Sequence, residues 1–455
     1  MGLIKIIKAK EFYEKSDDLL EKNKNSLEQE ETDKTVNEII TKIHSEGDEA
    51  LWNFIRKYEK EISEKLEVPK EIAKEAWKKL EADEPALASS MSFAAGNIKR
   101  FAELQKEQFK DFEEEILPGI ITGQRIIPVE RAAIYIPGGR YPLISSALMG
   151  LITASVAGVD EKILVTPPSI GGLPHRMLLA AAYIGGADRI FSIGGAQAIA
   201  AFAYGTQSVP KADLIIGAGN KYVSAAKRLL YGEVGIDFIA GPSDLLIIFD
   251  KDFLSASNTD MMAEMADVIA DDVNIIAADM LAQAEHDPDA RARVLVSDIN
   301  MAYLIEKALE LRLKKLPTSD IARASLEAGG LIIVYHNKEE AVKIANIIAP
   351  EHLELHVAFP FEWVKGLRNY GSLFIGQSSG EILGDYSAGI NNTLPTYGTS
   401  RFTGGLSVRN FLKTVTTLST VRGEGYLKAL QAAEQIALAE GLSAHAQSAA
   451  IRLDH

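Results

Sequence analysis

The chain contains no cysteine. This absence excludes disulfide bonds, zinc sites built on thiolates and catalysis through a thioester, because each of these needs a cysteine sulfur. If a protein with this sequence oxidises an aldehyde, water rather than a thiolate must act as the nucleophile. Any bound zinc must be held by nitrogen and oxygen atoms only. Eight histidines are available for such a site.

Long apolar runs are absent as well. No stretch reaches the ~20 consecutive apolar residues of a membrane-spanning helix. The first residues pass quickly into charged sequence without the apolar segment of a secretory signal, so we expect a cytoplasmic protein. The net charge of −15 argues against nucleic acid or an anionic membrane as a partner, because like charges repel. A length of 455 residues with 47% hydrophobic residues is typical of a globular protein of two or three domains.

The spacing of apolar residues predicts an α/β fold. Up to about residue 115, apolar residues recur at helical spacing within sequence rich in Glu and Lys, which predicts surface helices. From Arg131 onward, short strand-like runs alternate with helical segments, and a second series of this kind spans about 244–380. This alternation indicates parallel sheets with helices on both faces. We expect ligands at the carboxyl ends of the strands, where glycine and proline follow each run.

The dinucleotide fingerprint G-x-G-x-x-G is missing. Gly217-Ala218-Gly219 supplies the first two glycines, but Tyr222 stands where the third belongs. The turn Gly194-Gly195 opens a helix whose amino end is suited to a phosphate. Turns of this kind also occur in sheets that bind nothing, so they do not by themselves decide for a nucleotide site.

Three short patterns carry candidate chemistry. Gln283 and His286 are three residues apart, so on a helix both would point from one face, as metal ligands do, although helix surfaces often show this spacing by chance. Glu351-His352 places a carboxylate beside an imidazole, a pair suited either to proton transfer or to helix capping. Asp385 lies between glycines, where it can approach a ligand or form an Asx-turn. A metal with an acid–base pair indicates a dehydrogenase or a hydrolase.

Taken in order, a set of short motifs resembles the histidinol dehydrogenase family. These motifs lie at 135–139, 194–198, 240–243, 283–286, 350–353, 384–386, 394–396 and 442–445. The resemblance implies two Rossmann-like parallel-sheet domains with an N-terminal helical region and a C-terminal helical tail. It implies a helical arm at 1–30, a catalytic and metal-binding domain at 31–134 and 244–404, an NAD-binding domain at 135–243, and a dimerisation tail at 405–455.

The resemblance also implies site residues. One Zn²⁺ per subunit is expected on four ligands, with the last contributed by the exchanged tail of the partner in a homodimer: Gln283, His286, Asp385 and His445. The positions that match NAD contacts are Tyr135, Gln197 and Asn220. The positions that match substrate contacts are Ser243, Gln283, His286, His352, Asp385, Asn392, Glu440 and His445.

The implied reaction is the oxidation of L-histidinol through L-histidinal to L-histidine with two NAD⁺, a step of histidine biosynthesis. The resemblance assigns His352 as the acceptor of the alcohol proton and Glu351 as the activator of the water that attacks the aldehyde. Zinc is expected to orient the substrate.

Several positions depart from the family pattern, among them Ala218, Asp244 and Ala349, and two further departures bear on the site. Asn392 stands where the family usually carries a histidine, and asparagine forms hydrogen bonds but does not titrate near neutral pH. The distance between Ser243 and Gln283 is longer than expected, which suggests an inserted helical segment around 257–275. Two alternatives therefore stay open: a related enzyme acting on another small polar alcohol such as sulfopropanediol, and a binding protein without catalysis.

Overall fold

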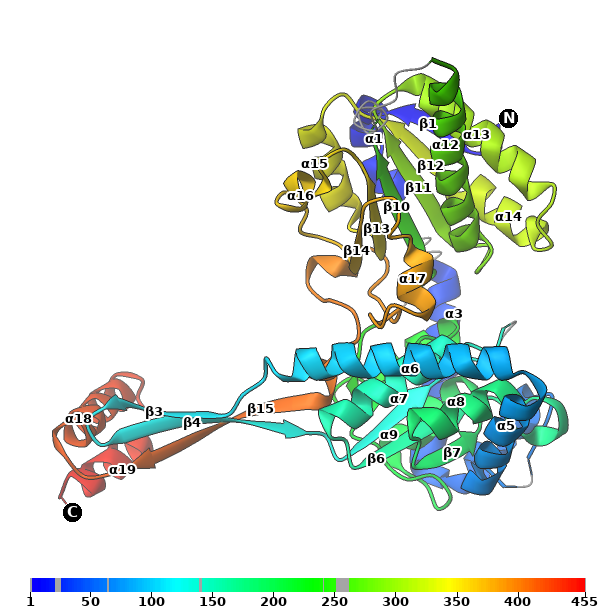
Figure 1. Ribbon diagram of the computed structural model, residues 1–455. Coiled ribbons are helices and arrows are strands. Elements are labelled where there is room, and N and C mark those ends of the chain that lie inside the picture. The colour runs from blue at the N-terminus through cyan, green and yellow to red at the C-terminus, as the bar shows by residue number, and fades with distance from the viewer. Residues whose placement is uncertain are drawn as a thin grey trace.

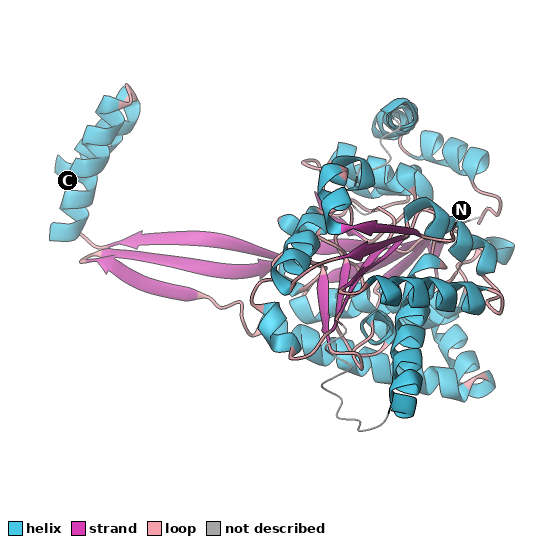
Figure 2. Ribbon diagram, turned by 90° about the horizontal axis from the view of Figure 1, so that it is seen from above, coloured by secondary structure: helices cyan, strands magenta, loops and turns pink. Residues whose placement is uncertain are grey.

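The computed structural model describes residues 2–20, 26–63, 65–138, 141–239, 241–250 and 262–454. These residues form two six-stranded sheets and one three-stranded sheet. Each large sheet is the centre of a domain, and the small sheet forms an arm that projects away from both domains (Figure 1, Figure 2). No helix among the described residues is long and apolar enough to cross a bilayer.

The first large sheet is parallel throughout, in the order β1-β12-β11-β10-β13-β14. Its strands are β1 (Lys5–Lys8), β10 (Asp244–Phe249), β11 (Arg291–Val296), β12 (Leu331–Val334), β13 (His352–His356) and β14 (Ser372–Ile375). Its central strands are continuous buried runs because helices cover both faces. One face packs against α12 (Met262–Ala284), α13 (Ile299–Leu313) and α14 (Ser319–Gly329). The other face packs against α1 (Ala9–Glu14), α2 (Ser16–Leu20), α15 (Lys338–Ile348) and α16 (Pro360–Val364).

The second large sheet has the order β2-β7-β6-β5-β8-β9, and only β2 runs antiparallel to its neighbour. Its strands are β2 (Glu67–Val68), β5 (Arg131–Tyr135), β6 (Glu161–Thr166), β7 (Arg189–Ser192), β8 (Leu214–Ile216) and β9 (Gly235–Ile236). One face is covered by α5 (Lys70–Asp83), α6 (Pro85–Lys106), α7 (Ile144–Ala157) and α8 (Arg176–Gly185). The other is covered by α3 (Ser26–Glu46), α4 (Asp48–Tyr58), α9 (Gly195–Tyr204) and α10 (Lys221–Leu230).

The arm consists of β3 (Phe112–Leu117), β4 (Ile120–Pro128) and β15 (Leu412–Thr420), antiparallel in the order β15-β4-β3. Beyond the strands lie α18 (Glu424–Ala439) and α19 (Ser443–Asp454), at the far end of the arm (Figure 1). The turn between β3 and β4 requires Gly119, which has φ +85° and no room for a Cβ beside the carbonyl oxygen of Val421. The remaining elements are η1 (Ile170–Gly172), α17 (Glu381–Tyr386), η2 (Thr399–Arg401) and η3 (Val408–Phe411).

The structure confirms the predicted α/β fold with parallel-sheet domains, but it differs from the expected boundaries. Residues 5–8 form an edge strand paired with β12 rather than part of a helical arm. The helices between residues 26 and 106 cover the second sheet and not the first. Apolar spacing reveals that a helix has a buried face, but it does not reveal which sheet lies beneath that face. Of the expected insertion, residues 257–261 lie outside the described residues, and the rest belongs to α12.

Candidate active site

A cavity of about 1730 Å³ lies between the two large sheets. Its walls include residues at or just before the start of first-sheet strands, among them Lys5, Ser243, Arg291 and Leu331, and residues that follow second-sheet strands, among them Pro137 and Asn220. The amino edge of one sheet therefore faces the carboxyl edge of the other. The carboxyl ends of the second-sheet strands, where ligands were expected, line the cavity, whereas the first sheet lines it with its amino edge.

The predicted acid–base pair lies at the amino end of β13. Helix α15 ends at Ile348, and Ala349 follows in a left-handed conformation with φ 51°. This turn places Glu351 and His352 at the start of the strand, where both are at least 95% buried. An Oε2 atom of Glu351 accepts a hydrogen bond of 2.9 Å from the backbone N–H of Asp244, at the start of β10. The pair is therefore held rigidly by the sheet.

His352 lies among three carboxylates. Its Nε2 is 3.3 Å from Oδ1 of Asp385, and its Nδ1 is 3.7 Å from Oε2 of Glu381 and 4.0 Å from Oε2 of Glu351. Burial alone would lower the pKa of His352, but the carboxylates of Glu351, Asp385 and Glu381 outweigh burial and raise it to about 10. Burial raises the pKa of Glu351 to about 8, against the opposing attraction of His352. The imidazole of His352 and the carboxyl group of Glu351 can therefore share a proton.

Glu381 was not among the residues predicted from the sequence. It precedes Asp385 by four residues on α17, so both carboxylates project from one face of this short helix. Figure 1 shows α17 on the side of the first domain that faces the second. Asp385 was expected in a loop flanked by glycines, but it lies within α17. The i, i+4 spacing was the signal that would have identified Glu381.

Gln283 and His286 do not share a helix, contrary to expectation. Helix α12 ends at Ala284, so Gln283 lies in its last turn and His286 lies in the turn that follows. His286 is exposed and lines the cavity, whereas Gln283 is fully buried. Among the residues that the structure describes, neither amide atom of Gln283 has a hydrogen-bond partner. A buried, unpaired amide is costly, so this side chain is suited to a ligand that the chain itself does not supply.

Four of the predicted substrate-contacting residues line the cavity together: Ser243, His286, Asp385 and Asn392. Asn392 is tied to the end of α17, because its Nδ2 donates to the backbone oxygen of Asp385 at 3.2 Å. The same Nδ2 lies 3.2 Å from Oγ of Ser145 on α7, which belongs to the second domain. Asn392 therefore links the two walls of the cavity.

The structure of one chain does not bring His445 and Glu440 to this cavity. Both are exposed, Glu440 at the end of α18 and His445 in α19. These helices lie at the far end of the arm (Figure 1). Within a single chain, the predicted zinc ligands and substrate contacts are therefore incomplete.

The predicted NAD-contacting residues all lie near the carboxyl edge of the second sheet. The hydroxyl oxygen of Tyr135 accepts a hydrogen bond from the backbone N–H of Gly195 at 3.1 Å. Nε2 of Gln197 donates to Oε1 of Glu59 at 3.3 Å. Oδ1 of Asn220 caps α10, accepting from the backbone N–H groups of the second and third helical residues at 3.0 and 3.1 Å. The turn at 217–219 thus leads into a self-capped helix.

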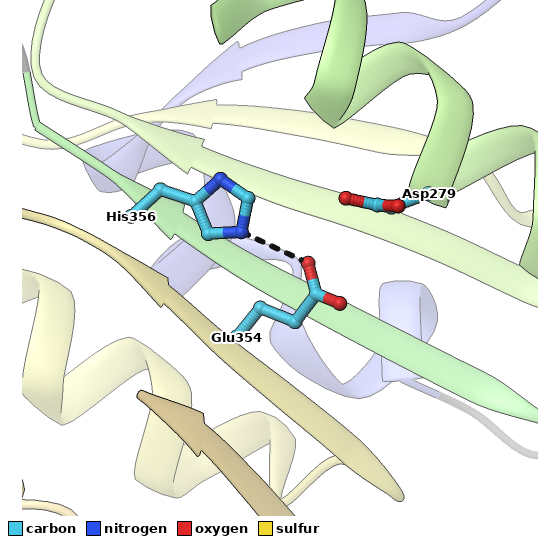
Figure 3. A group of neighbouring side chains, drawn as sticks. All are labelled: Asp279, Glu354 and His356. Atoms are coloured by element: carbon cyan, nitrogen blue, oxygen red, sulfur yellow. Dashed lines mark hydrogen bonds and ion pairs between the residues drawn. The ribbon is translucent and has the colours of Figure 1, made fainter. Parts of the chain in front are cut away.

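A second group of side chains lies behind the acid–base pair. Ligand atoms of Asp279, Glu354 and His356 lie within 4.8 Å of one another, and Nε2 of His356 is 3.1 Å from Oε2 of Glu354 (Figure 3). The other carboxylate oxygen of Glu354 accepts a 2.7 Å bond from the backbone N–H of Glu381, where α17 begins. Burial and the nearby Glu354 raise the pKa of Asp279 to about 7. This group of side chains supports α17. In the sequence it could have been recognised from the polar residues at alternate positions of β13, which project from one face of the strand.

Comparisons with known proteins identify the family. A family model described as histidinol dehydrogenase matches residues 22–453. The histidinol dehydrogenase of Prochlorococcus marinus is 42% identical over 94% of this chain and 92% of its own length. That of Thermus thermophilus is 42% identical over 92% of this chain and 95% of its own. The crystal structure of histidinol dehydrogenase from Elizabethkingia anophelis superposes with a TM-score of 0.86 and 31% identity, covering 100% of this chain and 99% of that one. The chain belongs to the histidinol dehydrogenase family.

Proposed function

We propose that this protein oxidises L-histidinol through L-histidinal to L-histidine with two NAD⁺, in histidine biosynthesis. The family indicates an NAD-dependent oxidoreductase that acts on a CH–OH group. The observation that carries the proposal is the buried pair of Glu351 and His352, with Asp385 3.3 Å from the imidazole at the edge of the cavity. An imidazole and a carboxylate in this arrangement can accept the protons that leave in two successive oxidations.

The first oxidation needs a base for the hydroxyl proton. Because the surrounding carboxylates raise the pKa of His352 to about 10, the imidazole must first lose its proton. Its Nε2 then accepts the hydroxyl proton while the hydride leaves the adjoining carbon, and NAD⁺ supplies the hydride acceptor when bound. Asp385 stabilises the imidazolium that results, because its carboxylate lies beside the same nitrogen. Glu381 lies on the side of the opposite nitrogen, 3.7 Å from Nδ1, and adds a further carboxyl group beside the ring.

The second oxidation needs a nucleophile for the aldehyde. With no cysteine in the chain, Glu351 takes a proton from water, which then attacks the carbonyl carbon. After His352 has released its first proton to solvent, the hydrated aldehyde gives its hydride to the second NAD⁺ and its hydroxyl proton to His352. The raised pKa of Glu351, about 8, suits a general base that must hold a proton near neutral pH.

The residues present fit a zinc ion. We assign it to Gln283, His286 and Asp385 together with the partner subunit's His445. The support is the unpaired, buried amide of Gln283 and a ligand set of nitrogen and oxygen atoms, which zinc accepts. When bound, zinc would orient the substrate by coordinating its polar groups. The other acid–histidine group, at Asp279, lies behind the pair and already contains a hydrogen-bonded imidazole.

A homodimer with exchanged tails would complete the site. The arm exposes large apolar side chains that include Ile116, Leu418 and Ile436, each more than half exposed. Apolar surface of this kind is typical of a face covered by another chain. A symmetric partner would bring its own Glu440 and His445 to the cavity, and the matching arm of this chain would reach the partner's cavity.

The relatives do not favour the two alternatives. The proteins at 40–42% identity over more than nine-tenths of this chain are histidinol dehydrogenases, whereas the alternatives were an enzyme for another alcohol such as sulfopropanediol and a binding protein without catalysis. The alternative substrate was considered because Asn392 stands where the family usually carries a histidine. Its amide still donates hydrogen bonds in the cavity.

The test is a substrate panel with the purified, zinc-loaded protein. We expect histidinol to yield two NADH per molecule and histidinal to yield one, with one zinc per subunit by metal analysis. Sulfopropanediol and other small alcohols serve as controls. NADH formation from another alcohol but not from histidinol would contradict the proposal, as would the absence of turnover with every substrate.

A further inference from the structure

The amino end of α9 lies at the carboxyl edge of the second sheet, a position where α/β proteins commonly bind phosphate. Here the chain's own oxygen atoms occupy it. The backbone N–H of Gly194 donates to Oε1 of Glu59 at 2.9 Å, and the backbone N–H of Gly195 donates to the hydroxyl oxygen of Tyr135 at 3.1 Å. These donors are therefore satisfied before any cofactor arrives.

The same Glu59 oxygen also fixes an amide. It accepts from Nε2 of Gln197 at 3.3 Å, and Gln197 is 97% buried, so its amide cannot turn without losing this bond. With the nitrogen directed at Glu59, Oε1 of Gln197 lies beside the turn at Gly195, where a Cβ would come within 2.6 Å of it. Gln197 is thereby presented as a hydrogen-bond acceptor. The hydroxyl of Tyr135 accepts from Gly195 and retains its own proton to donate.

Resting on the proposed NAD site, we propose that Glu59 is a positioning residue of that site: its carboxylate fills the phosphate position at the amino end of α9 and orients Gln197. This part of the site then receives a neutral hydrogen-bond donor of the cofactor, such as a ribose hydroxyl. The pyrophosphate of NAD then lies elsewhere, because at α9 it would meet a carboxylate beside N–H groups of Gly194 and Gly195 that are already bonded.

Glu59 is remote from its partners in the sequence. It directly follows α4, whereas Gln197 lies more than a hundred residues later. The packing of α4 against α9 brings them together. Glu61 lies two residues further along and is exposed. Its replacement by alanine removes one negative charge, as the replacement of Glu59 does, so it is a matched control.

The experiment measures NADH binding to the zinc-loaded protein by fluorescence titration, alone and in competition with sodium sulfate at ionic strength matched with sodium chloride. For Glu59→Ala we expect about tenfold weaker NADH binding, because one hydrogen-bonded anchor is lost, and clearly stronger competition by sulfate, which can now occupy the freed N–H groups. Glu59→Gln keeps an oxygen that accepts both bonds, so it should bind NADH within about threefold of the wild type. Glu61→Ala should match the wild type.

Three outcomes overturn the inference: equal NADH affinity in Glu59→Ala and the wild type, equal sulfate competition in the two, or a loss in Glu59→Gln as large as in Glu59→Ala. If Glu59→Ala does not fold, as judged by circular dichroism, the comparison of Glu59→Gln with the wild type decides. Failure of the wild-type protein to bind NADH would contradict the NAD site itself, whereas equal binding by wild type and Glu59→Ala would contradict only the role of Glu59.

Discussion

The imidazole of His352 lies 3.3 Å from the carboxylate of Asp385, although one belongs to a strand and the other to the helix α17. Asp385 is also a proposed zinc ligand, so one carboxylate links the metal site to the base. Any change at Asp385 therefore affects both at once. Glu354 lies two residues after His352 on β13 and holds the start of α17, so the same strand positions both partners of this contact.

Replacing Asp385 by asparagine should lower both zinc content and turnover. The amide is a poorer zinc ligand than a carboxylate, and it cannot stabilise an imidazolium. We expect far less than one zinc per subunit and a turnover lower by about 100-fold or more. Metal analysis and NADH formation check this. Glu362→Gln is the control, because the side chain of Glu362 is exposed on helix α16. An Asp385→Asn variant with full zinc content and full activity would contradict both assigned roles.

Glu351→Gln should affect the second oxidation more than the first. The amide oxygen still accepts the hydrogen bond from Asp244, so the start of β10 is kept in place, but the amide cannot deprotonate water. We expect about 100-fold slower NADH formation from histidinal and a smaller loss in the first hydride transfer from histidinol. Single-turnover measurements with each substrate separate the steps. Equal losses in both steps would exclude Glu351 as the activator of water.

Tail exchange predicts complementation between two inactive variants. In a mixed dimer, the cavity of a His445→Ala chain keeps its own Glu351 and receives an intact tail from a Glu351→Gln chain. We expect two inactive homodimers and a heterodimer that regains about half of the activity per dimer, because one of its two sites is complete.

Co-expression of the two chains with different affinity tags isolates this heterodimer. A heterodimer as inactive as its parents would show that each tail serves its own chain or no site at all. A tag-matched heterodimer of wild type with Glu351→Gln, which has one intact site under either arrangement, controls for the effect of mixing.

Removing the side chain of Asn392 should weaken substrate binding. Its Nδ2 links the backbone of Asp385 to Ser145 across the cavity, so Asn392→Ala loosens one wall against the other. We expect KM for histidinol to rise by about tenfold, corresponding to the loss of about one hydrogen bond. Steady-state kinetics measure this. Asn391→Ala, at the adjacent residue, should change KM little, and equal effects of the two variants would argue against a specific contribution of Asn392.

The half-buried carboxyl of Asp279 predicts a pH-dependent stability. Burial and Glu354 raise its pKa to about 7 in the folded protein, whereas in the unfolded chain it titrates near the ordinary value of 3.8. The unfolded state therefore releases this proton first, and the folded state loses relative stability as pH rises from about 4 to 7. Asp279→Asn removes this titration, so its unfolding midpoint should exceed that of the wild type by more at pH 8 than at pH 4.5.

Thermal unfolding followed by circular dichroism at the two pH values tests this. Asp271→Asn, exposed on the same helix, is the control for removing one negative charge. A difference between Asp279→Asn and the wild type that is independent of pH would contradict the assigned pKa.

Much of the fold follows from local pattern, because alternating strand and helix periods report which faces are buried. The strands beginning at Arg131 and Leu331 were readable in this way. The sequence did not predict which sheet the helices after residue 26 cover, because this choice depends on packing between distant segments. The short strand β1 was missed because four residues carry little periodic signal.

In the candidate site too, some features could be predicted from the sequence and others depend on tertiary packing. Glu351 and His352 are adjacent in the sequence, so their chemistry was visible before the fold. Glu59 and Glu381 meet their partners through tertiary packing, and the spacing of Glu381 from Asp385 was the one local signal for either residue. We propose that His445 completes a site in the partner subunit, so neither sequence spacing nor one chain's geometry could place it.

The proposed catalytic pair occupies one end of the first sheet. At the opposite end, the backbone N–H of Asp250 donates to the carbonyl oxygen of His356, ~13 Å along β13 from His352 at 3.3 Å per residue. Stabilising substitutions at this far end of the sheet would be remote from His352, so they are the natural first choice for engineering the enzyme.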